Sequence, residues 1–114
     1  MKAATRHPQI TIGALRTSAY RIPTDSPESD GTIEWKATTL VVVEVPAGNE
    51  IGIGYTYADA ATARLINDTL AEVVLGLDVM DVPVAWAAMV HAIRNLGRPG
   101  IASMAIAAVD AALW

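Results

Sequence analysis

The sequence contains no cysteine, and only 18% of its 114 residues are charged. The absence of cysteine excludes a disulfide framework and any thiolate metal site, and it agrees with a reducing compartment. A typical soluble domain has about 25% charged residues, whereas here 53% of the residues are hydrophobic. We therefore expect a single domain that has apolar surface left over once its core is filled.

Basic residues are scarce as well, since 8 Lys and Arg face 12 Asp and Glu, for a net charge of −4. No basic block is present, so neither nucleic acid nor an anionic membrane is an expected partner. The first twenty residues lack the apolar run of a signal peptide. The longest apolar stretch, residues 101–114, is interrupted by Asp110 and is too short to span a bilayer. These features predict a cytoplasmic protein.

The first half of the chain reads as a strand-rich unit. Residues 1–9 are polar and aperiodic and are expected to form a flexible leader before a domain over 10–114. Runs rich in β-formers predict three strands, over 10–22, 36–45 and 50–57. The turn residues 46–49 (PAGN) between the second and third strands favour an antiparallel meander. The segment 23–31 contains two prolines, one glycine and three acids, which predicts a long exposed loop that cannot pair in a sheet.

The second half has helical periodicity. A helix capped by Asp59 is predicted to end at Gly76, and a second helix runs from Asp81 to Gly97 with an apolar stripe that includes Trp86 and Leu96. Residues 101–114 are apolar all round, which predicts a third helix buried on every side. Strands followed by helices define an α+β fold, a three-stranded antiparallel meander followed by a bundle of three helices.

Glycines 52 and 54 stand between a strand and a helix, as in a dinucleotide-binding loop. The third glycine of that fingerprint is replaced by Tyr57, and no βαβ unit follows. We therefore expect these glycines to allow close backbone packing.

The ionisable residues give no catalytic constellation. Asp25, Glu28 and Asp30 lack the spacing of a calcium loop, so they predict a solvated acidic loop and no metal site. His7 and His91 are far apart in sequence and are interpreted as surface residues. No nucleophile with a partnered base is visible. Asp110 is expected to be a structurally paired acid, buried or at an interface.

Aromatic residues are the best candidates for ligand contact. Tyr20 ends the first predicted strand, and Trp35 follows the acidic loop. Core filling explains Trp35 equally well. Alternation sends Tyr55 and Tyr57 to the same face beside a turn, where two phenols suit a small-molecule contact.

Several runs together resemble the N-terminal capping domain of the enolase superfamily, in its mandelate racemase and muconate lactonizing enzyme branch. They are 20–23 (YRIP), 30–31 (DG), 35–41 (WKATTLV) and 52–57 (GIGYTY). The tail, 97–98 (GR) followed by 105–114 (AIAAVDAALW), resembles the helix that leads from that domain towards a (β/α) barrel. The last helix lacks a capping glycine and a basic last turn, which suggests a cut in mid-helix.

The resemblance implies a cap whose two loops, here 22–34 and 55–57, screen the active site and help to choose the substrate. It makes Tyr20, Asp25, Glu28, Trp35, Tyr55 and Tyr57 candidate specificity residues. The family's catalytic groups and metal ligands lie on the barrel, so none is carried over to this chain.

For the parent protein the resemblance implies a Mg²⁺-dependent racemase or acid-sugar dehydratase that abstracts a proton next to the carboxylate of a small substrate. Its partners are then its own barrel domain and further copies in a homo-oligomer. The alternative is a stand-alone binding module that self-associates through an apolar face including the last helix.

Overall fold

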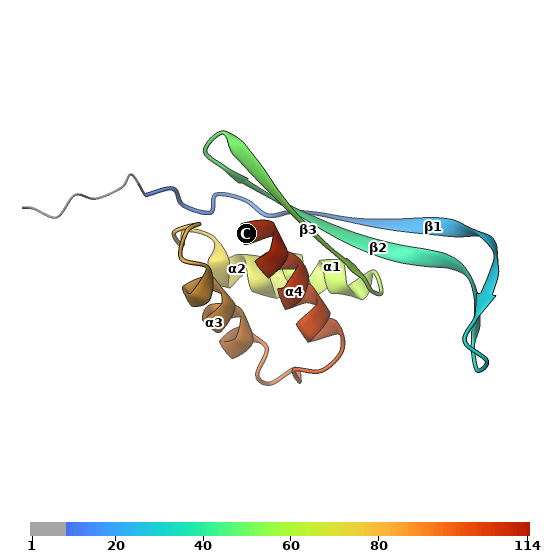
Figure 1. Cartoon of the computed structure of the whole chain (residues 1–114). Helices are drawn as coiled ribbons and strands as arrows, with labels where there is room; N and C mark the ends of the chain where they lie inside the picture. The colour runs from blue at the N-terminus through green and yellow to red at the C-terminus, as the bar shows by residue number, and fades with distance from the viewer. Residues whose placement is uncertain (1–8) are drawn as a thin grey trace, which may run out of the picture.

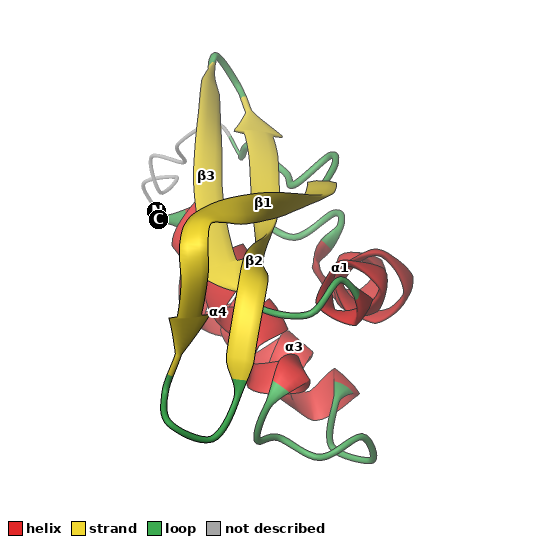
Figure 2. Ribbon diagram, turned by 90° about the vertical axis from the view of Figure 1, so that its right-hand side faces the viewer, coloured by secondary structure: helices red, strands yellow, loops and turns green. Residues whose placement is uncertain are grey.

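In the computed structural model, which describes residues 9–114, helices pack on one face of a three-stranded sheet (Figures 1 and 2). The strands β1 (Arg16–Ser29), β2 (Glu34–Ala47) and β3 (Glu50–Tyr57) are antiparallel and lie in the order β1-β2-β3. The α+β class and the meander are thus confirmed. The predicted leader and His7 fall outside the described residues, except for Gln9, which is exposed.

The first strand begins six residues later than predicted. Ile12 is buried and exchanges backbone hydrogen bonds with the segment that follows the first helix: its N–H donates to the Leu77 carbonyl, and its carbonyl accepts from the Gly76 N–H, both at 2.8 Å. The β-forming residues of 10–15 are therefore used for a contact with 76–79 and not in the main sheet.

The prediction of an unpaired loop over 23–31 is wrong. β1 continues to Ser29, and a hairpin projects from the body of the domain (Figure 1). Pro23 pairs with Ala37 and Glu28 pairs with Trp35, so residues 24–27 bulge from the ladder. β1 is an edge strand, where a proline nitrogen without a proton can face solvent, and this is why the two prolines are tolerated. Only residues 30–33 form the turn.

The first predicted helix is confirmed as one continuous segment. It comprises α1 (Ala61–Leu65), a π-helical turn η1 (Ile66–Leu70) and α2 (Ala71–Val74). The Asp59 carboxylate accepts a hydrogen bond from the Ala61 N–H at 2.8 Å, and Gly76 has φ +86°, as expected of a residue after a helix C-terminus.

The second helix, α3 (Val82–Ala92), ends earlier than predicted. Its buried row is Val82, Ala85 and Met89, continued by Ile93 after the helix ends. Trp86 and Leu96 are exposed, so assigning them to the core-facing stripe was wrong.

The last helix, α4 (Ile101–Leu113), packs across the inner face of β3. A Cβ built on Gly52 would collide with the carbonyl oxygen of Ala112, and one on Gly54 with that of Ala108, so the prediction of close backbone packing is confirmed. Burial on every side is wrong for α4 in this chain, because Ile101 and Met104 remain exposed. Between residues 9 and 114, none of the helices has the length and apolarity needed to cross a bilayer.

Candidate functional site

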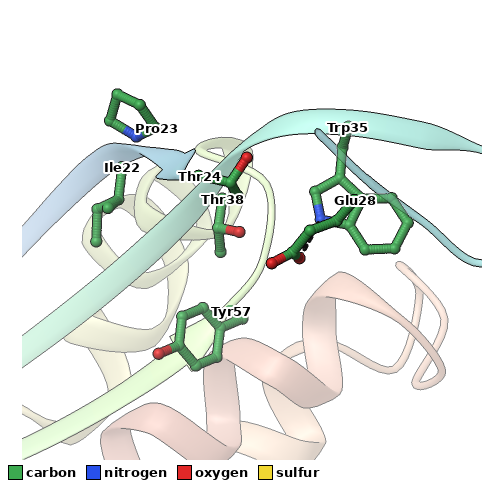
Figure 3. Close-up of a pocket in the computed structure, with 7 residues that line it drawn as sticks. All are labelled: Ile22, Pro23, Thr24, Glu28, Trp35, Thr38 and Tyr57. Atoms are coloured by element: carbon green, nitrogen blue, oxygen red, sulfur yellow. Dashed lines mark hydrogen bonds between the residues drawn. The ribbon is translucent and has the colours of Figure 1, made fainter. Parts of the chain in front are cut away.

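A surface cavity of about 580 Å³ lies where the projecting hairpin meets the end of β3 (Figure 3). All three strands contribute to its wall. The lining residues are Ile22, Pro23, Thr24, Glu28, Trp35, Thr38 and Tyr57.

The bulge in β1 creates this cavity. Because residues 24–27 are looped out, the ladder resumes at Glu28, directly opposite Trp35. The indole Nε1–H of Trp35 donates a hydrogen bond to Glu28 Oε2 at 3.1 Å, which fixes both side chains on the cavity wall. Tyr57 enters from β3, and in Figure 3 it faces this pair across the opening.

The structure brings together three of the six candidate specificity residues, Glu28, Trp35 and Tyr57. Tyr55 lies beside Tyr57, with ring centroids 6.0 Å apart at an interplanar angle of 80°, but it is not part of the cavity wall. Tyr20 pairs with Leu40, which pairs in turn with Tyr57, so the two tyrosines share a sheet face.

Asp25 is exposed in the bulge and does not line the cavity. Four wall residues were not among the candidates: Ile22, Pro23, Thr24 and Thr38. Once β1 and β2 are aligned, the pairing of Ile22 with Thr38 follows from alternation. Thr24 could not be found in that way because the bulge breaks the register. Its hydroxyl is buried with no hydrogen-bond partner among the described residues.

The electrostatics of the hairpin centre on Asp30, at the turn. Its Oδ1 accepts a hydrogen bond from the Thr32 hydroxyl at 2.7 Å and from the backbone N–H groups of Ile33 and Thr32, each at 2.9 Å. These donors favour the charged carboxylate and lower the pKa of Asp30 from 3.8 to about 2. Asp30 is thus a structural residue of the turn and lies outside the cavity wall.

The cavity can bind but has no acid and base pair. Its only carboxylate, Glu28, is engaged by Trp35, and no histidine, lysine or arginine occurs among its lining residues. Over residues 9–114 no three His, Cys, Asp or Glu side chains gather as a metal ion would need. The described residues therefore do not fit a Mg²⁺ site.

A second, smaller cavity of about 260 Å³ lies between α3 and α4. The Arg98 guanidinium is 5.3 Å from the centre of the Trp86 ring, a cation–π distance. Asp110 is half-buried on the same wall, and within residues 9–114 its carboxylate makes no hydrogen bond or ion pair. Its expected pairing is therefore not observed in this chain. His91 is exposed, as predicted.

Residues 17–114 match the family described as mandelate racemase/muconate lactonizing enzyme, N-terminal domain. The chain belongs to this family. A similar solved structure is a mandelate racemase/muconate lactonizing enzyme-like protein from Rubrobacter xylanophilus, with 49% identity and a TM-score of 0.88 over 91% of this chain and 29% of that one. A racemase from Streptomyces coelicolor with bound magnesium has 34% identity and a TM-score of 0.86, over 90% and 30% of the two chains.

Curated relatives agree with this assignment. The 3,6-anhydro-alpha-L-galactonate cycloisomerase of Streptomyces coelicolor is 32% identical over 90% of this chain and 30% of its own length. The L-rhamnonate dehydratase of Saccharopolyspora erythraea is 39% identical over 68% of this chain. The chain thus spans about 30%, or less, of the relatives it matches, and the enolase-superfamily resemblance of the sequence is confirmed.

Proposed function

We propose that residues 10–114 form the capping domain of an enolase-superfamily enzyme and that the hairpin cavity contacts the substrate of its catalytic domain. The observation that carries this proposal is the cavity itself. Its wall contains residues from both segments expected to screen an active site, 22–34 and 55–57, which are distant in sequence, together with Trp35 and Thr38 of β2.

The parent enzyme is proposed to be a Mg²⁺-dependent racemase or acid-sugar dehydratase that abstracts a proton next to a carboxylate. Support comes from relatives named as a galactonate cycloisomerase and a rhamnonate dehydratase, and from a magnesium-bound racemase of the same fold. The metal and the proton-transfer groups would then lie outside this chain.

The role of this chain is to bind and orient the substrate and to exclude water. Glu28 is an acceptor, so it suits the hydroxyl groups of an acid sugar and repels its carboxylate. Tyr57 adds a phenol that both donates and accepts, while Trp35 covers the opening with an apolar ring. A wall of this kind excludes water and strengthens the electrostatics of a catalytic site beneath it.

The test is a chimera in which residues 10–114 replace the matching segment of the Streptomyces coelicolor cycloisomerase. Tyr57→Phe is expected to lower kcat/KM about tenfold, because one hydrogen bond to the substrate is lost. Tyr55→Phe is the matched control: Tyr55 is 62% exposed and Tyr57 63%, but Tyr55 lies outside the cavity wall. Equal effects of the two substitutions in a folded, active chimera would contradict the proposal.

The alternative, a module that self-associates through its last helix, has weaker support. α4 buries seven of its residues within this chain and leaves Ile101 and Met104 as its large exposed apolar side chains, with Trp114 just beyond it. A polar double substitution of Leu113 and Trp114 that left assembly unchanged, measured by size exclusion with light scattering, would remove it.

A further inference from the structure

The second cavity, between α3 and α4, is a groove with apolar walls and one acid. The two helices lie side by side in the helical layer (Figure 1). Ser103, Ile106 and Asp110 recur at steps of three and four residues, so they form one row along α4. α3 faces this row with Trp86 and Val90, which are one turn apart. We call this cavity the helix groove.

One charged group in the helix groove has no partner. The Arg98 guanidinium lies 5.3 Å from the centre of the Trp86 ring, and the Ser103 hydroxyl donates a hydrogen bond to the Arg98 carbonyl. Asp110 is the only charged residue of α4, and within residues 9–114 no base lies within ion-pair distance of its carboxylate. The helix groove therefore contains an acid whose charge is not balanced by a neighbour in the described part of the chain.

The burial of Asp110 makes this imbalance costly. Asp110 is half-buried, and a carboxylate that is partly removed from water loses hydration that only a cation or strong hydrogen-bond donors can replace. Lysine and arginine pack their apolar stems on apolar walls while their charged heads reach a polar group. Val90 and Ile106 offer such walls beside Asp110. The helix groove thus suits one inserted basic side chain, and its volume of about 260 Å³ is below the roughly 300 to 1,000 Å³ of small-molecule sites.

We propose that the helix groove receives one lysine or arginine side chain of the catalytic domain, whose cation pairs with Asp110. The inference rests on the function proposed above, which supplies that domain. A separate protein needs about 800 Å² on each side for a standard interface, far more than one small groove offers. A domain of the same polypeptide is held at a high effective concentration, so a single pair can fix its position. The matched relatives are long enough to contain such a domain, since this chain spans about 30% of their length or less.

The experiment is hydrogen exchange with mass spectrometry on peptides from α3 and α4, in the isolated 114-residue chain and in the cycloisomerase chimera described above. Asp110→Asn removes the charge and keeps the shape of the side chain. Glu72→Gln is the matched control, because Glu72 is an exposed acid of α2 outside the groove wall. In the chimera we expect these peptides to exchange about tenfold faster in Asp110→Asn than in Glu72→Gln, since the partner's charge is left half-buried and unpaired. In the isolated chain we expect equal exchange in the two variants.

Equal exchange of the two variants in the chimera overturns the docking site. Faster exchange of Asp110→Asn in the isolated chain also overturns it, because the partner of Asp110 then lies within this chain. If Asp110→Asn behaves as expected while Tyr57→Phe and Tyr55→Phe change kcat/KM equally, the docking site is supported and substrate contact at the hairpin cavity is contradicted. The reverse pattern supports the substrate contact and removes the docking site. The Rubrobacter xylanophilus protein, which is 49% identical, replaces the cycloisomerase as host if that chimera does not fold.

Discussion

Gly52 and Gly54 set how closely the sheet and α4 approach each other. Each faces a backbone carbonyl of α4, from Ala112 and Ala108 respectively, at a distance that leaves no room for a methyl group. The helix could move away only by opening the buried contacts of Val109 and Ala105, which are fully buried. The absence of two side chains thus determines the packing of the helical layer.

Gly54→Ala is expected to destabilise the fold by about 3 kcal/mol, because overpacking against a backbone carbonyl cannot be relieved by a side-chain rotation. Gly13→Ala is the control, since a Cβ on Gly13 meets nothing within 4 Å and its φ is not positive. We expect Gly13→Ala to stay within about 0.5 kcal/mol of the wild type. Urea unfolding followed by circular dichroism measures both, and similar values for the two would contradict the role given to Gly54.

The low pKa of Asp30 predicts that the stability of the hairpin turn depends on pH. Its pKa is lowered to about 2 in the folded chain, against 3.8 for an unperturbed carboxyl. The carboxylate therefore stabilises the turn above about pH 3.8, and this contribution is lost as the pH falls through about 2. Carboxyl carbon NMR should give Asp30 a midpoint near 2, and Thr32→Ala should raise it because the strongest donor is removed. A midpoint near 3.8 in the wild type would exclude the three hydrogen bonds.

At the scale of elements, the projecting hairpin forms most of the cavity wall. One side-chain hydrogen bond, from the Trp35 indole to Glu28, joins its two strands. Glu28→Ala removes the acceptor of the Trp35 indole. Because the pair is solvent-exposed, we expect little change in the free energy of unfolding but faster hydrogen exchange of the Trp35 indole proton. Asp25→Ala is the control, as an acid of the same strand that makes no hydrogen bond to the indole. Unchanged exchange in Glu28→Ala would show that the bond does not fix Trp35.

The sequence supports some elements better than others, for physical reasons. The doubly apolar run of β2 and the alternation of β3 predict the meander, because both depend on local pattern. The pairing of Pro23, Glu28 and Ser29 with β2 could not be predicted, since prolines and acids disfavour strands unless the strand lies at an edge with a bulge. Edge position is a property of the assembled sheet. Tyr57 can be identified as a site residue from the alternation of β3. Thr24 cannot, because it lies in the bulge of β1.

At the scale of the whole molecule, the domain is elongated because the hairpin extends beyond the helical layer (Figure 1). The radius of gyration is 16.8 Å, compared with about 13 Å for a compact domain of this size. The core lies at one end, between the inner face of the sheet and the helices. The hairpin therefore presents a binding wall without belonging to the core, and its cavity can vary in sequence at little expense to folding.

This division predicts how the molecule unfolds. Val109 is fully buried between α4 and the sheet, so Val109→Ala removes two methyl groups from the one region where both layers meet. A loss of about 2 kcal/mol is expected, or roughly 8 °C in Tm. Because α4 is the main link between the sheet and the helices, the helical signal in far-UV circular dichroism and the near-UV signal of the sheet tyrosines, Tyr20, Tyr55 and Tyr57, should shift together. Met104→Ala, on the exposed side of α4, should move neither. Two separate transitions in Val109→Ala would mean that the sheet keeps its structure without the helical layer, and that α4 does not join the two layers into one cooperative unit.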